Sequence, residues 1–506
     1  MNALCEYGDK DDVMKVMNTA KPRVRIAVWL TLATTVLVLS GCITVGPDYV
    51  RPEIPMPATW HSTLEAGLAD RDGSGLVEWW STLNDPVLSG LIDRTVTRNL
   101  DLREAKARLK ESRARLGISQ SGLFPSVDAT ASGTKSRSSE ETGGGQERES
   151  YAAGFDAAWE LDFFGGTKRS VEAAEADLQA GREDLHDVLV TLTAEVALNY
   201  IDLRTVQARL TAVEANLQAQ EESHRLTLAR VEAGLDDELT ALQSQYTLEN
   251  TRSQLPGLRT SLEEAMNRLS VLLGEAPGFL HTALAEPAPV PVAPPDVAIG
   301  VPADLLRRRP DIRRAERNLA AQTARIGAAT AELYPKLTLN GSIGLEALSP
   351  DGLLQTSSHA WTIGPRIIWP VFDAGAVRRN IDVQSALQEQ ALIAYESTLL
   401  TALEEVENAL VAYAEEGQRR SSLEAAAQAA EGALDLAQAQ YLAGSSDFHS
   451  VLDARRSALS FQDQLAQSNG TVTSNLIRLY KALGGGWNSP DTDTTINNST
   501  QSEEIS

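Results

Sequence analysis

The sequence predicts an α+β membrane protein whose protomer contains two similar halves of long, coiled-coil-like helices plus four transmembrane strands. The first observation behind this prediction is an internal repeat. The stretch LREAKARLKESRARLGISQSGLFPSVDATASGTK at 102–135 is matched by IRRAERNLAAQTARIGAATAELYPKLTLNGSIGLE at 312–346. Three pairs of identical residues are separated by the same distance, 335 − 125 = 210 residues. They are Pro125 and Pro335, Gly234 and Gly444, and Gly274 and Gly484. Because solenoid repeats run at about 20 to 50 residues, this interval predicts two large homologous halves.

The second observation is the length of the predicted helices, three in each half. The sequence is rich in Ala, Leu, Gln, Glu and Arg, the composition of long helices. The longest helix is predicted at 166–232, roughly 67 residues or about 100 Å, with its counterpart at 375–442. Shorter helices are predicted at 86–121, 239–273, 303–332 and 449–483. Since ordinary helices average about 11 residues, we expect an extended barrel of helices, with a kink where Pro256-Gly257 interrupts one of them.

The third observation is a set of segments with alternating polarity between the first and second helix of each half. Four strands are predicted, at about 123–135, 151–163, 333–346 and 360–371. In YAAGFDAAWELDF, apolar Phe155 and Trp159 alternate with charged Asp156 and Glu160. The length of about 10 residues suits a tilted transmembrane strand, although the alternation equally suits a soluble sandwich with one wet face. In a membrane, four strands cannot close a barrel, so a dimer or trimer is the smallest assembly that removes the open edges.

The N-terminus predicts export and lipid attachment. Lys21, Arg23 and Arg25 precede a short apolar run, which is typical of a secretory signal peptide over residues 1–41. The run ends in Leu-Ser-Gly-Cys, a match to the bacterial lipobox, so we expect the sulfur of Cys42 to be acylated. The alternative is an incidental cysteine at the end of a signal. Residues 1–20 do not fit a signal peptide, so translation can start at Met14 or Met17 instead.

Charge and histidine spacing exclude two classes of function. The formal net charge of −24 argues against nucleic-acid binding, which needs a surplus of Lys and Arg. The six histidines are scattered without metal-ligand spacing, and His-Glu-x-x-His does not occur. We therefore expect no enzyme activity, no metal and no cofactor other than the covalent lipid.

Three stretches together resemble a known family. They are CITVGPDYVRPEIPMPATW at 42–60, LLRRRPDIRRAERNLAAQTARIGAATAELYPKLTLNGSIG at 305–344 and YKALGGGW at 480–487. The chain resembles the TolC-like outer-membrane factors, and among them the efflux lipoproteins of tripartite resistance pumps. The resemblance implies a homotrimer with a 12-stranded β-barrel and a 12-helix α-barrel tunnel, anchored by lipid in the bacterial outer membrane and reaching into the periplasm. It also implies two partners, a periplasmic adaptor (membrane fusion) protein and an inner-membrane transporter of the RND type.

The resemblance also orders the chain into domains. After the signal peptide come an N-terminal equatorial segment at 42–85, a first repeat at 86–275, a Pro-rich linker at 276–303, a second repeat at 304–486 and a disordered polar tail at 487–506. The function that the resemblance implies is passive export of small molecules such as drugs and toxic compounds. A type I protein secretion channel remains an alternative, and so does a periplasmic helical scaffold lipoprotein that transports nothing.

Two helix turns are the candidate functional sites. A glycine that adopts a left-handed conformation can end each long helix, which is a sufficient structural role for Gly234 and Gly444. The resemblance additionally places these glycines at periplasmic tips that contact the adaptor. It assigns a periplasmic gate to four side chains near the second turn: Tyr441, His449, Asp453 and Arg456. A ring of Asp453 carboxylates would attract cations, and His449 would make gating sensitive to mild acid. The alternative is that these charges are simply solvated.

Overall fold

The structure of the chain is a computed structural model, and it describes residues 44–62, 68–69, 76–292, 294, 297–298, 302, 306 and 308–487. The predicted signal peptide, Cys42 and the tail after Trp487 lie outside the described residues, as do parts of the predicted linker. The chain forms two compact units. The strand unit contains residues 44–48, 119–172 and 324–384, and the helix unit contains the other described residues.

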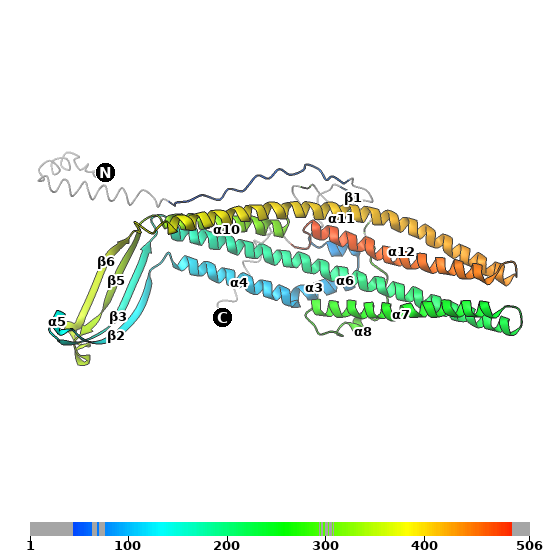
Figure 1. Cartoon of the computed structure of the whole chain (residues 1–506), viewed down its shortest axis with the longest axis horizontal. Coiled ribbons are helices and arrows are strands. Elements are labelled where there is room, and N and C mark those ends of the chain that lie inside the picture. The colour runs from blue at the N-terminus through cyan, green and yellow to red at the C-terminus, as the bar shows by residue number, and fades with distance from the viewer. Residues whose placement is uncertain are drawn as a thin grey trace, which may run out of the picture. The chain divides into compact units, whose positions relative to one another are not determined.

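Helices make up most of the chain, and their lengths repeat between the two halves (Figure 1). The first half contains α3 (Pro86–Arg98), α4 (Leu100–Ser121), α6 (Gly166–Glu232) and α7 (Glu238–Leu272). The second half contains α10 (Pro310–Ala331), α11 (Ala376–Leu442) and α12 (Phe448–Ala482). Helices α6 and α11 have 67 residues each, α7 and α12 have 35, and α4 and α10 have 22. None of these described helices contains a stretch that is apolar enough to cross a membrane.

Short elements connect the long ones. They are β1 (Leu68–Ala69), η2 (Trp79–Leu83), α5 (Glu140–Gly143), α8 (His281–Leu284), β4 (Val297–Ala298), η3 (Pro350–Gly352) and η4 (Thr356–Ser358). The two-residue strands β1 and β4 pair in parallel.

The predicted helix at 86–121 is two helices, because Asn99 breaks it. The Asn99 backbone leaves the helical region, with φ −56° and ψ 139°. Its side-chain oxygen accepts a hydrogen bond from the Leu102 amide at 2.9 Å, which caps the start of α4. Its side-chain nitrogen donates to the carbonyl of Leu272 at 2.8 Å and thereby caps the end of α7. The side chain satisfies the ends of two helices, which a continuous helix through residue 99 could not do.

Helix α7 continues through Pro256, and the predicted kink at this residue stays a prediction. Pro256 and Gly257 are exposed, whereas the flanking Leu255 and Leu258 are buried in a cluster with three apolar residues of α6. Pro256 therefore lies on the exposed side of α7, while Leu255 and Leu258 on either side of it pack against α6.

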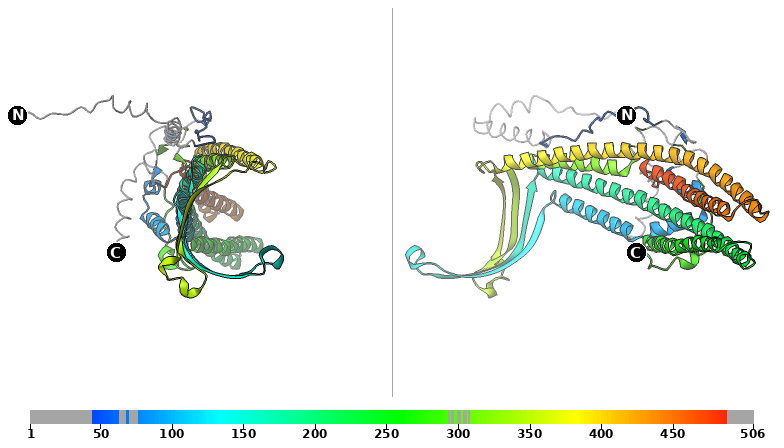
Figure 2. Two further views of the ribbon diagram at one scale, coloured as in Figure 1. Left: turned by 90° about the vertical axis from the view of Figure 1, so that its left-hand side faces the viewer. Right: turned by 45° about the vertical axis from the view of Figure 1, so that its right-hand side comes forward.

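Four strands form one antiparallel sheet in the order β2-β3-β5-β6, which Figure 2 shows as a bowed surface. The strands are β2 (Ser126–Arg137), β3 (Glu147–Leu161), β5 (Lys336–Ala347) and β6 (His359–Ile368). Phe155 on β3 pairs with Ile343 on β5, which in turn pairs with Trp361 on β6. Strands β2 and β6 are the two edges of this sheet. The chain is thus mostly helical with a four-stranded sheet, as the sequence predicts.

The main apolar core lies in the helix unit, where both repeats meet. Trp79 is 1% exposed and stacks on Tyr480 of α12, with ring centroids 5.4 Å apart. Tyr200 of α6 and Leu269 of α7 belong to the same cluster and are completely buried. This core holds the two hairpins, α6–α7 and α11–α12, in one body.

Candidate functional site

The turns that end the two hairpins have the same local geometry. Gly234 and Gly444 have φ values of +70° and +74°, which favour glycine over any other residue. Each turn is followed by an aspartate whose carboxylate caps the next helix: Asp237 accepts from the Thr240 amide at 2.9 Å, and Asp447 accepts from the Ser450 amide at 3.0 Å. Hydrogen bonds from the hydroxyl groups of Thr240 and Ser450 lower the pKa of the two aspartates. Both tips are therefore compact, capped turns.

Tyr441 joins the two tips. Its hydroxyl donates a 2.6 Å hydrogen bond to Oδ2 of Asp236, which lies in the other hairpin's turn. Arg230 at the end of α6 donates to the same oxygen at 2.7 Å, and its guanidinium carbon lies 4.9 Å from the centre of the Tyr441 ring. The other face of the cluster is apolar, because Tyr441 also packs against Phe448 with ring centroids 5.3 Å apart. We call Tyr441, Asp236 and Arg230 the tip lock.

Electrostatics keeps the tip lock in one protonation state over a wide pH range. Burial and the Asp236 charge raise the pKa of Tyr441 to about 12, so its hydroxyl remains a donor. The hydrogen bond from Arg230 lowers the pKa of Asp236, so its carboxylate remains an acceptor. The donor and the acceptor therefore each stay in the form that the hydrogen bond needs.

The remaining candidate residues form a separate, exposed row on α12. His449 Nε2 lies 3.3 Å from Oδ2 of Asp453, and Arg456 Nη1 lies 3.3 Å from its Oδ1. Arg456 also donates to the hydroxyl of Tyr246 on α7 at 3.4 Å, a contact between residues 210 apart and hence at equivalent positions of the two repeats. All three side chains of the row are more than half exposed, so within one chain these ion pairs contribute little to stability.

The sequence predicts Tyr441 as a site residue but does not predict its partners. Asp236 and Arg230 have Ser446 and Gln440 at their equivalent positions in the second repeat, so the repeat pattern gives no signal for them. Two adjacent aspartates in GLDDEL are a local signal: the second, Asp237, caps the next helix, so the first, Asp236, is available for another contact.

The segment that follows Cys42 is fixed to the protein at several points; we call residues 44–62 the strap. In the strand unit, the Val45 amide donates to the Phe164 carbonyl at 3.1 Å, and the buried Arg169 donates to Asp48 at 2.6 Å. A Cβ atom added at Gly46 would overlap the Cα atom of Gly327. The strap therefore lies directly against the chain just after the predicted lipid site.

In the helix unit the strap has further polar anchors. The hydroxyl of Tyr49 donates to Glu316 at 3.2 Å, and Arg51 forms an ion pair with the same carboxylate at 3.1 Å. The hydroxyl of Ser62 donates to Glu407 at 2.6 Å. Burial and the charge of Glu316 raise the pKa of Tyr49 to about 12, so this phenol also remains a donor.

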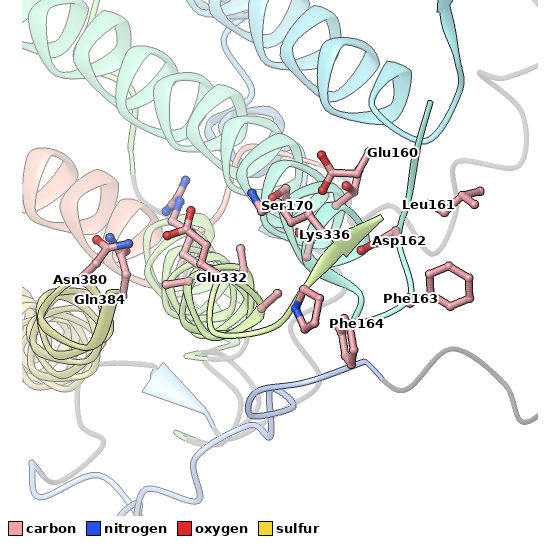
Figure 3. A pocket seen from close by; sticks show the side chains of 17 residues that line it. Glu160, Leu161, Asp162, Phe163, Phe164, Ser170, Glu332, Lys336, Asn380 and Gln384 are labelled. Carbon is pink, nitrogen blue, oxygen red and sulfur yellow. The ribbon is translucent and has the colours of Figure 1, made fainter. Parts of the chain in front are cut away.

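A pocket of about 440 Å³ lies in the strand unit, where β3 leads into α6 and α10 leads into β5 (Figure 3). Glu160, Asp162, Glu332 and Lys336 contribute charges of both signs to its wall. Ser170 also lines the pocket, but its hydroxyl donates to the Gly166 carbonyl at 2.9 Å. A serine nucleophile would instead donate to a general base. Within the described part of the chain, no three His, Cys, Asp or Glu side chains come together as a metal site.

Comparisons with known proteins agree with the repeat and the fold. The family model described as "Outer membrane efflux protein" matches residues 91–275 and 301–485, and these two matches are also 301 − 91 = 210 residues apart. Nodulation protein T of Rhizobium leguminosarum bv. trifolii is 32% identical over 457 residues, which cover 89% of this chain and 96% of that protein. The solvent efflux pump outer membrane protein SrpC of Pseudomonas putida is 33% identical over 458 residues, 89% of this chain and 97% of that protein.

A solved structure supports the same assignment. The outer-membrane channel OprN matches with a TM-score of 0.83 at 36% identity, covering 88% of this chain and 99% of that chain. The resemblance found in the sequence is thus confirmed over nearly the whole chain, and the chain belongs to the outer membrane efflux protein family.

Proposed function

We propose that three copies of this chain form an outer-membrane channel that passively exports small molecules, including drugs and toxic compounds, as one part of a tripartite efflux system. In this proposal the copies share a 12-stranded barrel that continues into a 12-helix periplasmic tunnel. An inner-membrane transporter of the RND type supplies the energy and is reached through a periplasmic adaptor protein. The observation that carries the proposal is the exposed apolar face of the sheet.

Large apolar side chains gather on one face of the sheet and remain uncovered in a single chain. Phe155, Ile343 and Trp361 lie side by side across three strands and are 57%, 66% and 71% exposed. Ile363 and Ile367 extend the same face along β6, at 68% and 69% exposure. A contiguous apolar face of this kind needs a non-aqueous neighbour, and a lipid bilayer suits strands of 10 to 15 residues.

The opposite face of the sheet is polar. Thr130 donates to Asp156 at 2.8 Å, and the Ser342 and Thr362 hydroxyls are 2.8 Å apart. In a closed barrel this face would line a water-filled lumen, which suits the passage of polar and charged solutes. The apolar exterior and the polar interior together favour a channel over a scaffold that transports nothing.

The internal repeat predicts how neighbouring copies pair their strands. Inside the chain, β3 joins the first half to the second by pairing with β5, with Ala157 opposite Gly341. Shifting both residues by 210 positions gives Ile367 on β6 and Ala131 on β2. If three copies form six equivalent units around a pore, Ile367 of one copy lies opposite Ala131 of the next.

Cysteine cross-linking tests this register. Opposite residues of antiparallel strands have Cα atoms about 4.5 to 5.5 Å apart, which a disulfide can span. We expect the paired substitutions Ile367→Cys and Ala131→Cys to give covalent dimers and trimers on oxidation of membranes that contain the full chain. The matched control, Ile367→Cys with Thr130→Cys, is one residue out of register and should cross-link poorly. Equal yields from both pairs, or monomers from both, would contradict the shared barrel.

We place the gate and the adaptor contacts at the hairpin tips. Three copies of Asp453 would form an acidic ring, which Arg456 and His449 partly neutralise, and the tip lock at Tyr441 would hold each protomer in its resting arrangement. The turns at Gly234 and Gly444 would be the surfaces that meet the adaptor. The distances described above, between His449, Asp453 and Arg456 and around Tyr441, support this proposal.

We also propose that Cys42 carries the lipid that anchors the chain to the outer membrane. The strap supports this, because its polar contacts begin at Val45, three residues after Cys42. A lipid at Cys42 would therefore be attached three residues before the first of these contacts. Labelling with radioactive palmitate tests the assignment, with loss of label expected for Cys42→Ser and retained label for Cys5→Ser.

A further inference from the structure

Helices α11 and α12 enclose a pocket of about 430 Å³ with an unusual wall. Two cationic side chains, Arg478 and Lys481, line it together with the carboxamides of Asn408 and Asn475 and one carboxylate, that of Glu405. The cations belong to α12, close to the end of that helix, and they are exposed. The internal repeat places equivalent residues between α6 and α7. The pocket can therefore be compared with the equivalent site of the first repeat.

The equivalent site in the first repeat differs in its polar residues, and its arginine is paired. Asn199 and Asp202 stand at the positions of Ala409 and Ala412. Leu198, Ala265 and Val271 stand at the positions of Asn408, Asn475 and Lys481. Leu198 and Ala265 pack on the main core. Arg268 stands at the position of Arg478 and forms a 3.0 Å ion pair with Glu195, the counterpart of Glu405. In the first repeat, the arginine is therefore neutralised across the hairpin.

In the second repeat the equivalent glutamate, Glu405, pairs with Arg309 instead of with Arg478. Arg309 occupies the position equivalent to Asn99. Asn99 caps the end of α7, and Arg309 caps the end of α12 by donating to the Ala482 carbonyl at 2.7 Å. Unlike Asn99, Arg309 carries a charge, and it is only 8% exposed. Its charge is balanced by ion pairs with Glu405 and Asp311, each at 2.7 Å. Glu405 therefore pairs with Arg309 and leaves Arg478 without a carboxylate partner among the described residues.

The carboxamide next to Arg478 positions the guanidinium. Asn475 is 7% exposed and donates to the Ala412 carbonyl at 2.8 Å, which fixes its orientation. Its side-chain oxygen then accepts from Nη1 of Arg478 at 2.8 Å. One edge of the guanidinium is held in this way, and its other donors, the ammonium of Lys481 and the amide of Asn408 remain for a ligand.

We propose that this pocket is an anion site that takes a small carboxylate or phosphate group, with Arg478 and Lys481 as the charged donors. A guanidinium, an ammonium and a carboxamide within one pocket are the donors that such oxygens need. The chain as a whole carries a formal charge of −24, so local donors rather than the overall field must hold the anion. The oxygens can come from a free anion or from an acidic side chain of a second copy of this chain. This inference is independent of the export role.

Equilibrium dialysis of the full-length, detergent-solubilised chain against radiolabelled inorganic phosphate and acetate, at constant ionic strength, tests the proposal. We expect saturable binding of one anion per chain. Replacing both cations (Arg478→Gln with Lys481→Gln) should weaken binding at least about tenfold, since each removes a charge-assisted hydrogen bond. Asn408→Leu restores the residue of the first repeat and should also weaken binding by filling the pocket. The matched control is Arg268→Gln, the equivalent arginine, which should leave binding within about twofold.

The mass of the assembled protein distinguishes the two sources of the anion. If neither anion binds but the Arg478/Lys481 and Asn408 variants lose oligomer mass while Arg268→Gln does not, the ligand is a carboxylate of a second copy. If neither anion binds and the oligomer is unchanged in every variant, the proposal is wrong. It is also wrong if Arg268→Gln weakens anion binding as much as the double variant does. Circular dichroism of each variant checks that the helices are intact.

Discussion

The hydroxyl of Tyr441 and the carboxylate of Asp236 lie 205 residues apart in the chain and 2.6 Å apart in space. This hydrogen bond connects the tip of one helical hairpin to the tip of the other, and Arg230 reinforces it from α6. Since each hairpin belongs to a different repeat, the bond links the two halves of the protomer at the position where the family resemblance places the gate.

Removing the Tyr441 hydroxyl should loosen the tips. Tyr441→Phe keeps the packing on Phe448 but deletes the donor to Asp236, and a hydrogen bond to a charged group contributes about 1.5 to 3 kcal/mol. We expect faster amide hydrogen exchange at both tips and higher channel conductance. Tyr246→Phe is the control for the exchange measurement, because that hydroxyl makes only an exposed 3.4 Å contact with Arg456. Equal rates of amide hydrogen exchange in the two variants would show that the tip lock does not hold the tips together.

Removing the charges at Asp453 and Arg456 should make the channel leaky. In an assembled ring, each carboxylate can pair across subunits, so Asp453→Ala with Arg456→Ala deletes both sides of that contact. The measurement is single-channel conductance in planar bilayers. Gln243→Ala, at the position equivalent to Asp453 in the first repeat, is the matched control. Unchanged conductance in the double variant would count against the gate.

Acid should open the tip lock. The pKa of Asp236 is lowered in the folded chain, so its contribution to stability is present above the pKa of an unfolded aspartate, about 3.9. That contribution is lost as the pH falls through the lower, folded pKa, so exchange at the tips should accelerate below about pH 4. Hydrogen exchange corrected for its intrinsic pH dependence measures this. Asp236→Asn should show fast exchange at every pH, and an unchanged acid response in that variant would assign the effect to other carboxylates.

A methyl group at Gly46 should displace the strap. Gly46 has φ +88°, and an added Cβ would overlap the backbone of Gly327. Gly46→Ala should therefore expose residues 44–50 to protease. Gly444→Ala has a similar φ of +74° but nothing within 4 Å of the added Cβ, so it should cost only about 1 to 2 kcal/mol of backbone strain, at its own turn. Protection of the strap in Gly46→Ala would show that its other anchors suffice.

The sequence predicts the elements well, because the duplication presents each helix and strand twice. The 67-residue span of α6 follows from its periodicity, and the alternation around Phe155 and Trp159 identifies β3 and its apolar face. Two residues within the predicted helices have effects that depend on tertiary neighbours. Asn99 breaks a helix where its side chain caps the end of α7, and α7 continues through the exposed Pro256.

The contacts of the candidate site were harder to predict. The partner of Tyr441 lies in another repeat, and no local pattern reports a contact over 205 residues. The loss of the Arg478 ion pair depends on Arg309, which lies 169 residues earlier in the chain and acts through Glu405. Such relationships depend on how the hairpins pack, so they become visible only in three dimensions.

The central claim is that several copies of this chain share one channel. Planar-bilayer conductance of the purified mature protein, with its oligomer mass determined in the same detergent, tests that claim most directly. We predict discrete ion-conducting steps from a trimer, with larger steps for the variant that lacks Asp453 and Arg456. A monodisperse monomer that conducts no ions would contradict the account.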